Sequence, residues 1–284
     1  MQGPGAERLS GDRLRLWHGP IDLIVTADGA REAAFAAARA RFATILTELV
    51  AELPHLRQPL DGLPFTGPIA RRMARAVQPH TAFVTPMAAV AGAVADEILA
   101  AMTAAAPLTR VAVNNGGDIA LHPAPGETFT LAMASTDAHD LGRITIRAGD
   151  GVGGIATSGR HGRSHSLGIA DSVTVLARDA ASADAAATLI ANAVDLPGHP
   201  AITRRPASEL APDSDLGDHD VTTACGPLTD VEIDTALSAG ETCAEAMRAT
   251  GVIHAAALFL QGRSMMVAAE REIRSDPVPY TLPT

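Results

Sequence analysis

Four short stretches of the chain carry residues whose types and spacing could do chemistry. The first, at 114–118, closes a predicted strand with two asparagines, two glycines and an aspartate. Glycines at such a turn let a ligand approach backbone N–H groups, although a plain hairpin turn has the same composition. Both interpretations stay open for this stretch, whose candidate ligand contacts are Asn114, Asn115, Gly116, Gly117 and Asp118.

The second stretch, 156–166, reads ATSGRHGRSHS. Its hydroxyls, backbone N–H groups and two arginines could hold a phosphate or a pyrophosphate, while a solvated loop is the structural alternative. His161 and His165 have the four-residue spacing of a helical metal site, but the glycines between and before them argue against a helix. The candidate ligand contacts here are Thr157, Ser158, Gly159, Arg160, Arg163 and His165.

The third stretch is a D-A-A-A-T run, from Asp184 to Thr188. On a helix this spacing puts a carboxylate and a hydroxyl on one face, and such hard oxygens suit Mg²⁺. An exposed aspartate beside an ordinary helical threonine would have the same pattern. The fourth stretch, 213–220, is acidic but has Ala224 where a calcium loop needs its glutamate, so we expect a solvated loop at the rim of a site.

Composition excludes several classes of protein. All 22 basic residues are arginine, so the chain has no lysine for a Schiff base, a nucleotide-binding P-loop or a protein kinase. A net charge of −10 and 3% aromatic residues argue against nucleic acid and anionic membranes as partners. The polar start of the chain has no apolar leader pattern, and the two cysteines fit no metal or redox spacing. We therefore expect a cytoplasmic protein.

Apolar periodicity predicts the elements that position these stretches. The predicted fold class is α+β, with largely antiparallel sheets backed by helices in one domain over 1–284, of which 1–12 form a flexible tail. The 86–106 helix contains two acidic residues, which favours a core helix over a membrane span. Helices are expected at 35–53, ended by Pro54, and at 86–106, 180–193 and 230–249. Two short strands around a Gly-Pro turn are expected within 13–27, and further strands at 110–115, 118–122, 128–134, 143–148 and 172–177. A hairpin is expected at 256–269, turning at Gly262-Arg263, and loops at 54–68 and 195–220.

Four motifs, taken in order, give the chain a resemblance to the ApbE family of flavin transferases. More closely, the chain resembles an ApbE-like branch with a shortened chain. The motifs are TPMAAVAGAVAD at 85–96, NNGGDI at 114–119, ATSG followed by SH within 156–166, and SVTVLA followed by SADAAAT within 172–188. The resemblance extends from about residue 20 to the C-terminal hairpin. It implies a T-fold, and a chemistry in which Mg²⁺ helps cleave the pyrophosphate of FAD and FMN passes to a threonine of a target protein. The implied metal ligands are the Ala88 carbonyl, Asp184 and Thr188, the last two being the implied catalytic residues.

The chain departs from the family pattern around the flavin. Thr85 stands where the family has a flavin-contacting aspartate, and Ala91 where it has a ligand-contacting lysine. The Asn/Asp-Pro-x-Thr-Gly run expected after His165 is missing. The stacking tyrosine has no counterpart upstream, since the chain's tyrosine is Tyr280, so Trp17 or Phe83 would have to serve.

Two functions follow. One is Mg²⁺-dependent binding of FAD or FMN, with FMN transfer to a protein substrate or FAD pyrophosphate cleavage. The alternative is a non-catalytic binder of a flavin, pterin or purine, acting in cofactor biosynthesis or sensing. Both imply a small ligand with a phosphate or a planar heterocycle, and either could operate as a homo-oligomer.

Overall fold

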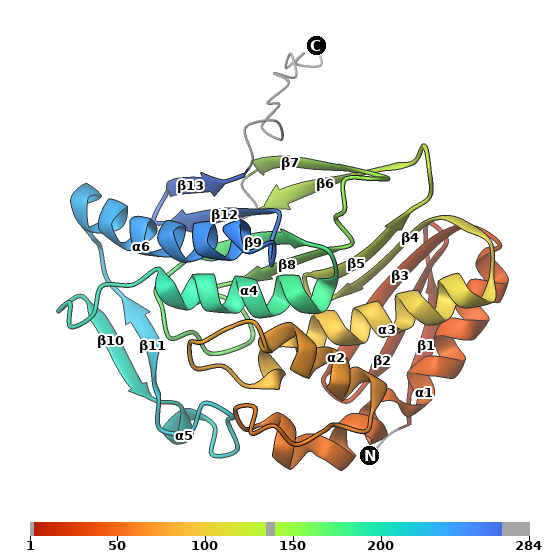
Figure 1. Ribbon diagram of the computed structural model, residues 1–284, viewed down its shortest axis with the longest axis horizontal. Coiled ribbons are helices and arrows are strands. Elements are labelled where there is room, and N and C mark those ends of the chain that lie inside the picture. Colours follow the sequence, from red (N-terminus) through yellow and green to blue (C-terminus); the bar gives the residue numbers. More distant parts are fainter. Residues whose placement is uncertain (1–2, 135–139, 269–284) are drawn as a thin grey trace, which may run out of the picture.

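The computed structural model describes residues 3–134 and 140–268. A nine-stranded antiparallel sheet runs in the order β1-β2-β3-β4-β5-β8-β9-β12-β13 (Figure 1). Its strands are β1 (Gly5–Leu9), β2 (Arg13–His18), β3 (Ile21–Gly29), β4 (Leu108–Asn115), β5 (Asp118–Pro123), β8 (Gly154–Ser158), β9 (Ser172–Ala177), β12 (Ala255–Leu260) and β13 (Arg263–Val267). The mixture of helices with antiparallel strands confirms the α+β fold class.

The order of elements repeats, although the sequence does not. Each half of the sheet has two strands, then helices, then two more strands, with the second and third strands paired. The halves are β2-β3 to β4-β5 and β8-β9 to β12-β13, joined by the pairing of β5 with β8. The helices are α1 (Arg31–Leu56), α2 (Pro68–Val77), the short η1 (Pro86–Ala89) and α3 (Val90–Ala105) in the first half, and α4 (Ala180–Ala193), α5 (Ala207–Leu210) and α6 (Asp230–Ala249) in the second.

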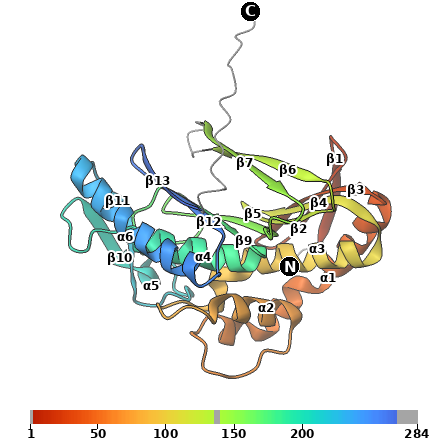
Figure 2. The same cartoon turned by 45° about the horizontal axis from the view of Figure 1, so that its top comes forward.

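The long helices cover one face of the sheet, and a hairpin covers part of the other. In Figures 1 and 2, α1, α3, α4 and α6 lie side by side beneath the strands. The predicted apolar stripe of α1, from Phe35 to Leu49, is buried there. β6 (Thr128–Ala134) and β7 (Asp140–Arg147) form a separate two-stranded sheet on the opposite side. Ile146 of β7 and Leu121 of β5 belong to a small apolar cluster between the two layers.

The structure corrects several sequence-based boundaries. Residues 5–9 of the predicted tail form β1, held by backbone pairing to β2 rather than by burial. Pro54 lies inside the last turn of α1, where the missing N–H removes only one hydrogen bond. The C-terminal hairpin turns at Gln261-Gly262, both with positive φ, one residue earlier than expected.

Five other elements were not predicted. α2 follows a proline at its first position and has an apolar stripe from Ile69 to Val77, signals that the sequence did contain. β8 begins at Gly154 and includes the first three residues of the 156–166 stretch, for which a solvated loop was the structural alternative. The expected loop at 195–220 contains β10 (Ile202–Pro206) and α5, and its last residue begins β11 (Asp220–Cys225).

α3 and α4 cross very closely where the two halves meet. A Cβ on Gly92 of α3 would lie 2.2 Å from the carbonyl oxygen of Ala180, and a Cβ on Gly154 of β8 would lie 2.2 Å from the Ala180 nitrogen. Asp96 of α3 accepts hydrogen bonds of 3.0 Å from the N–H groups of Ala180 and Ala181. The start of α4 is therefore fixed to α3 through backbone groups that its own helix leaves unpaired.

One helical run, Pro86–Ala105, is long and apolar enough to cross a membrane by length and composition. Its buried side chains pack into the main core cluster with residues of the sheet, and Asp96 binds α4 from its middle. These contacts agree with the expected core helix.

We predict that Asp96→Ala lowers the free energy of unfolding by about 1–3 kcal/mol, because two buried N–H groups of α4 lose their acceptor. Chemical denaturation followed by circular dichroism measures this loss. Asp96→Asn, which keeps one acceptor oxygen, should lose less, and Asp213→Ala on the surface should change little. Equal stability of Asp96→Ala and the wild type would contradict the role given to this carboxylate.

Candidate functional site

The turn after β4 divides its polar side chains between the two faces of the sheet. Asn115 is buried and pairs in register with Asp118, which puts both on the face covered by helices. Asn114 points to the other face, where its Oδ1 accepts a hydrogen bond of 2.9 Å from the N–H of Gly117. Gly116 and Gly117 both have positive φ, which explains the choice of glycine. One turn therefore contributes to two different environments.

On the helix face, the backbone of α3 binds both Asn115 and Asp184. The amide of Asn115 donates to the carbonyl of Ala91 at 3.0 Å. The N–H of Gly92 donates to Oδ2 of Asp184, also at 3.0 Å. Burial raises the pKa of Asp184 well above its usual value, and the nearby charge of Asp118 raises it further. At the position of the family's lysine, Ala91 thus acts through its backbone.

Asp118 is the second carboxylate of this environment. Burial raises its pKa to about 7, although the N–H of Thr157 and the charge of Arg163 oppose the shift. Its Oδ1 atom is buried and has no hydrogen-bond partner in the described structure. Burial raises the pKa of Asp96 to about 6, and the charge of Asp96 adds to the raised pKa of Asp184. Three carboxylates with raised pKa values therefore gather at the junction between the halves.

The predicted metal ligands lie on elements that pack together here. Ala88 belongs to η1, which packs against α4, and α4 carries Asp184 and Thr188. Both α4 residues are partly accessible to solvent. Among the described residues no group of three His, Cys, Asp or Glu side chains is placed to hold a metal ion. A hard cation nevertheless fits the oxygen donors of this region. They include the carboxylate of Asp184 and the unpartnered Oδ1 of Asp118, whose charge acts on Asp184.

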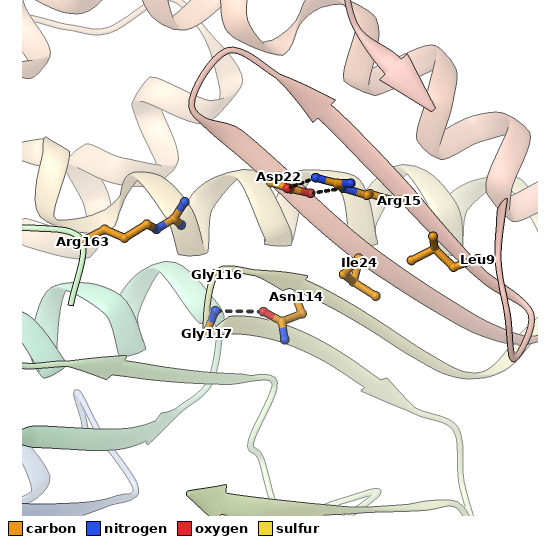
Figure 3. Close-up of a pocket in the computed structure, with 8 residues that line it drawn as sticks. All are labelled: Leu9, Arg15, Asp22, Ile24, Asn114, Gly116, Gly117 and Arg163. Carbon is orange, nitrogen blue, oxygen red and sulfur yellow. Dashed lines mark hydrogen bonds and ion pairs between the residues drawn. The ribbon is translucent and has the colours of Figure 1, made fainter. Parts of the chain in front are cut away.

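On the other face of the turn lies a cavity of about 500 Å³ (Figure 3). Register pairs Arg15 with Ile24 and Ile24 with Asn114, so three neighbouring strands contribute one row of side chains to its floor. Arg15 forms an ion pair of 2.7 Å with Asp22, which lowers the pKa of that carboxyl. The remaining lining residues are Leu9, Gly116, Gly117 and Arg163.

Arg163 reaches back over the turn from the 159–166 segment (Figure 3). A Cβ on Gly116 would lie 2.0 Å from one guanidinium nitrogen of Arg163, so a larger residue at 116 would displace the end of that side chain from the turn. The positive charge of Arg163 lowers the pKa of Asp22 in the cavity and opposes the rise in the pKa of Asp118 behind the turn. No carboxylate of the described chain forms an ion pair with it, which leaves its donors available to a ligand.

The other predicted contacts in 157–165 have different surroundings. The hydroxyl of Thr157 meets that of Thr174 at 2.9 Å, and Arg160 forms an ion pair of 2.7 Å with Asp171. Ser158 ends β8, Gly159 packs against the backbone of residue 171, and His165 is exposed. The structure thus brings Asn114, Gly116, Gly117 and Arg163 to one cavity, and Asn115 and Asp118 to the carboxylate environment.

The acidic 213–220 segment packs against the segment that precedes η1. Thr85, which is buried, donates its hydroxyl to Asp215. The ring of His219 stacks on Phe83 at 4.0 Å. A carboxylate from a distant loop therefore lies beside the position where the family has an aspartate. The other candidate stacking residue, Trp17, covers Gly5, and Tyr280 lies outside the described residues.

Sequence reasoning missed four lining residues of the cavity, Leu9, Arg15, Asp22 and Ile24. Alternation in β2 and β3 predicts that Arg15 and Asp22 share the face opposite the core, but not that Asn114 joins them. In the sequence, Asp96 is only one of two acidic residues within an apolar helix. A lone carboxylate at such a place is a signal of a buried polar contact.

Comparison with known proteins places the chain in a family. A family model described as "AbpE bacteria" matches residues 6–266. The chain belongs to the ApbE family. This confirms the resemblance drawn from the four motifs.

Two archaeal relatives match part of the chain. A UPF0280 protein of Methanopyrus kandleri is 42% identical over 135 residues, which cover 47% of this chain and 51% of that protein. A UPF0280 protein of Methanosarcina acetivorans is 34% identical over 171 residues, which cover 58% and 65%. The chain thus matches less than two thirds of the length of these relatives.

Two solved structures of low sequence identity align with most of the chain. The crystal structure of the ApbE protein from Thermotoga maritima aligns with a TM-score of 0.50 over 91% of this chain and 97% of that one, at 12% identity. The flavin transferase ApbE from Vibrio cholerae aligns with a TM-score of 0.48 over 94% and 98%, also at 12% identity. At such low identity, the Thermotoga maritima structure supports a shared fold and nothing finer.

We predict that the metal-free protein loses stability as the pH rises from about 4 to about 7. Asp118 ionises near pH 4 in the unfolded chain but near 7 in the folded one, so the folded state binds more protons in this window. Urea denaturation at several pH values measures the slope. Asp118→Asn should make it shallower, with Asp96 maintaining part of it, whereas Asp213→Asn should not alter it. An unchanged slope in Asp118→Asn would refute the prediction.

Proposed function

We propose that this protein is a Mg²⁺-dependent flavin-nucleotide enzyme that cleaves the pyrophosphate of FAD and transfers FMN to a hydroxyl acceptor. The observation that carries the proposal is the carboxylate environment at the junction of the halves, where the charge of Asp118 acts on Asp184, and Asp184 and Thr188 are partly accessible residues of one helix. Membership of the ApbE family supports the same chemistry. The acceptor would be a threonine of a protein substrate, or water.

Each part of the site would have a distinct task. Asp184, Thr188 and the Ala88 carbonyl would hold Mg²⁺, which when bound neutralises phosphate charge and orients in-line attack. The acceptor oxygen would bond to the phosphorus of the FMN half, the pyrophosphate P–O bond would break, and AMP would leave. The hydroxyl proton would pass to solvent. Arg163 and the Gly116-Gly117 backbone would bind the phosphates from the other face of the turn.

A second candidate is a non-catalytic binder of a flavin, pterin or purine. The specific observation in its favour is the 500 Å³ cavity, a volume typical of small-ligand sites. Its apolar lining residues Leu9 and Ile24, together with the Arg15–Asp22 pair and the Asn114 amide, suit a planar heterocycle that carries polar substituents.

We predict that incubation with FAD and Mg²⁺ yields FMN and AMP, detected by chromatography. Asp184→Asn should lower the rate by about 100-fold or more, because a lost metal contact removes transition-state stabilisation of several kcal/mol. Asp213→Asn, a surface change, should leave the rate unaltered.

Absence of turnover in the wild type, or equal turnover in Asp184→Asn, would overturn the enzymatic proposal. Stoichiometric ligand binding without turnover, weakened in Arg163→Ala but not in the exposed Arg178→Ala, would favour the binder instead.

A further inference from the structure

The Oδ1 atom of Asp118 is an unexplained feature of the carboxylate environment. It is a fully buried carboxylate oxygen without a donor in the described structure, although buried polar atoms are nearly always hydrogen-bonded. The other buried atoms without partners are nitrogens of His18, Arg72 and His80. Asp118 is therefore the one described residue at which a buried side-chain oxygen is left without a partner.

The neighbouring groups do not supply the missing donor. The amide of Asn115, its partner in the β4–β5 register, donates to the Ala91 carbonyl. The hydroxyl of Thr157 meets Thr174, so only the Thr157 backbone interacts with Asp118. Arg163 acts on Asp118 through its charge and forms no ion pair with it within the described residues.

The charge of Asp118 acts on a second buried acid, Asp184. Asp184 is close enough to Asp118 for the charge of one to disfavour ionisation of the other. Two backbone N–H groups, of Ala91 and Gly92, favour the ionised form of Asp184. A pair of facing carboxylates of this kind is stabilised either by a shared proton or by a cation between them.

We propose that Asp118 is the second carboxylate ligand of the divalent cation held by Asp184. The two aspartates come from opposite halves of the molecule, Asp118 from the start of β5 and Asp184 from the first turns of α4. Two negative charges balance one divalent cation, and all available donors are oxygens, which favours Mg²⁺ or Mn²⁺ over softer metals. The cation would thereby bridge the halves.

This inference rests on the proposed function for the cation itself, but it assigns Asp118 a role beyond contact with the nucleotide. It also extends the ligand set of Ala88, Asp184 and Thr188, which contains a single carboxylate. A shared proton is the competing explanation, and Asp118→Asn separates the two because asparagine imitates the protonated acid in shape.

We predict that Asp118→Asn weakens Mn²⁺ binding to the metal-free protein on the order of tenfold or more. Titration followed by electron paramagnetic resonance of free Mn²⁺ measures the affinity without reference to activity. The same variant should melt at a higher temperature than the wild type without metal, because the repulsion is removed, but should gain less from added Mn²⁺. Asp213→Asn is the matched control, an aspartate-to-asparagine change on the surface.

The outcomes distinguish this inference from the proposed function. If Asp118→Asn binds Mn²⁺ as the wild type does while Asp184→Asn does not, the role of Asp118 is wrong and the cation at Asp184 stands. If the wild type itself fails to bind Mn²⁺, both are wrong. Circular dichroism of each variant establishes that lost binding does not reflect lost folding.

Discussion

The close crossing of α3 and α4 is the contact on which the candidate site depends. Gly92 and Gly154 leave no room for a Cβ against the first residues of α4, and Asp96 binds two of that helix's N–H groups. Because the helices meet through backbone atoms, the Gly92 N–H reaches the carboxylate of Asp184. The same contact joins the helices of the two halves, so the packing of the halves determines the position of Asp184.

The two faces of the sheet carry different polar groups at the 114–118 turn. The helix face of the 114–118 turn has buried carboxylates with raised pKa values, and the opposite face has a cavity lined by two arginines. Arg163 lies across the turn, and its charge acts on the carboxylates of Asp22 on one face and Asp118 on the other. Such a division would let a phosphorylated ligand meet a cation on one side and guanidinium groups on the other.

Local patterns predicted the elements whose side chains alternate or recur regularly. The predicted helix at 180–193 and the strand at 172–177 agree with α4 and β9, and the stripe from Phe35 to Leu49 predicted the buried face of α1. The D-A-A-A-T run also lies on one helix as expected. β8 was missed because glycine and serine have low strand propensity, and its strand character comes from its neighbours β5 and β9.

Long-range contacts could not be read from the sequence. Arg160 resembles a phosphate contact, yet Asp171 binds it in the folded chain. The hydrogen bond from Thr85 to Asp215 joins residues 130 positions apart, and nothing local to either predicts it. Arg15 and Asn114 meet in one cavity only because β3 pairs with both β2 and β4. Sequence thus indicated the chemical groups, while the register and the helix crossing decided which of them meet.

The central claim is that the junction of the two halves binds a divalent cation. Anomalous diffraction from crystals soaked in Mn²⁺ tests it most directly, because the metal is located without reference to activity. The account predicts a strong peak about 2.0–2.3 Å from a carboxylate oxygen of Asp184, with Asp118 as its neighbour. A saturated crystal with no peak at Asp184, or with its only peak elsewhere, would contradict it.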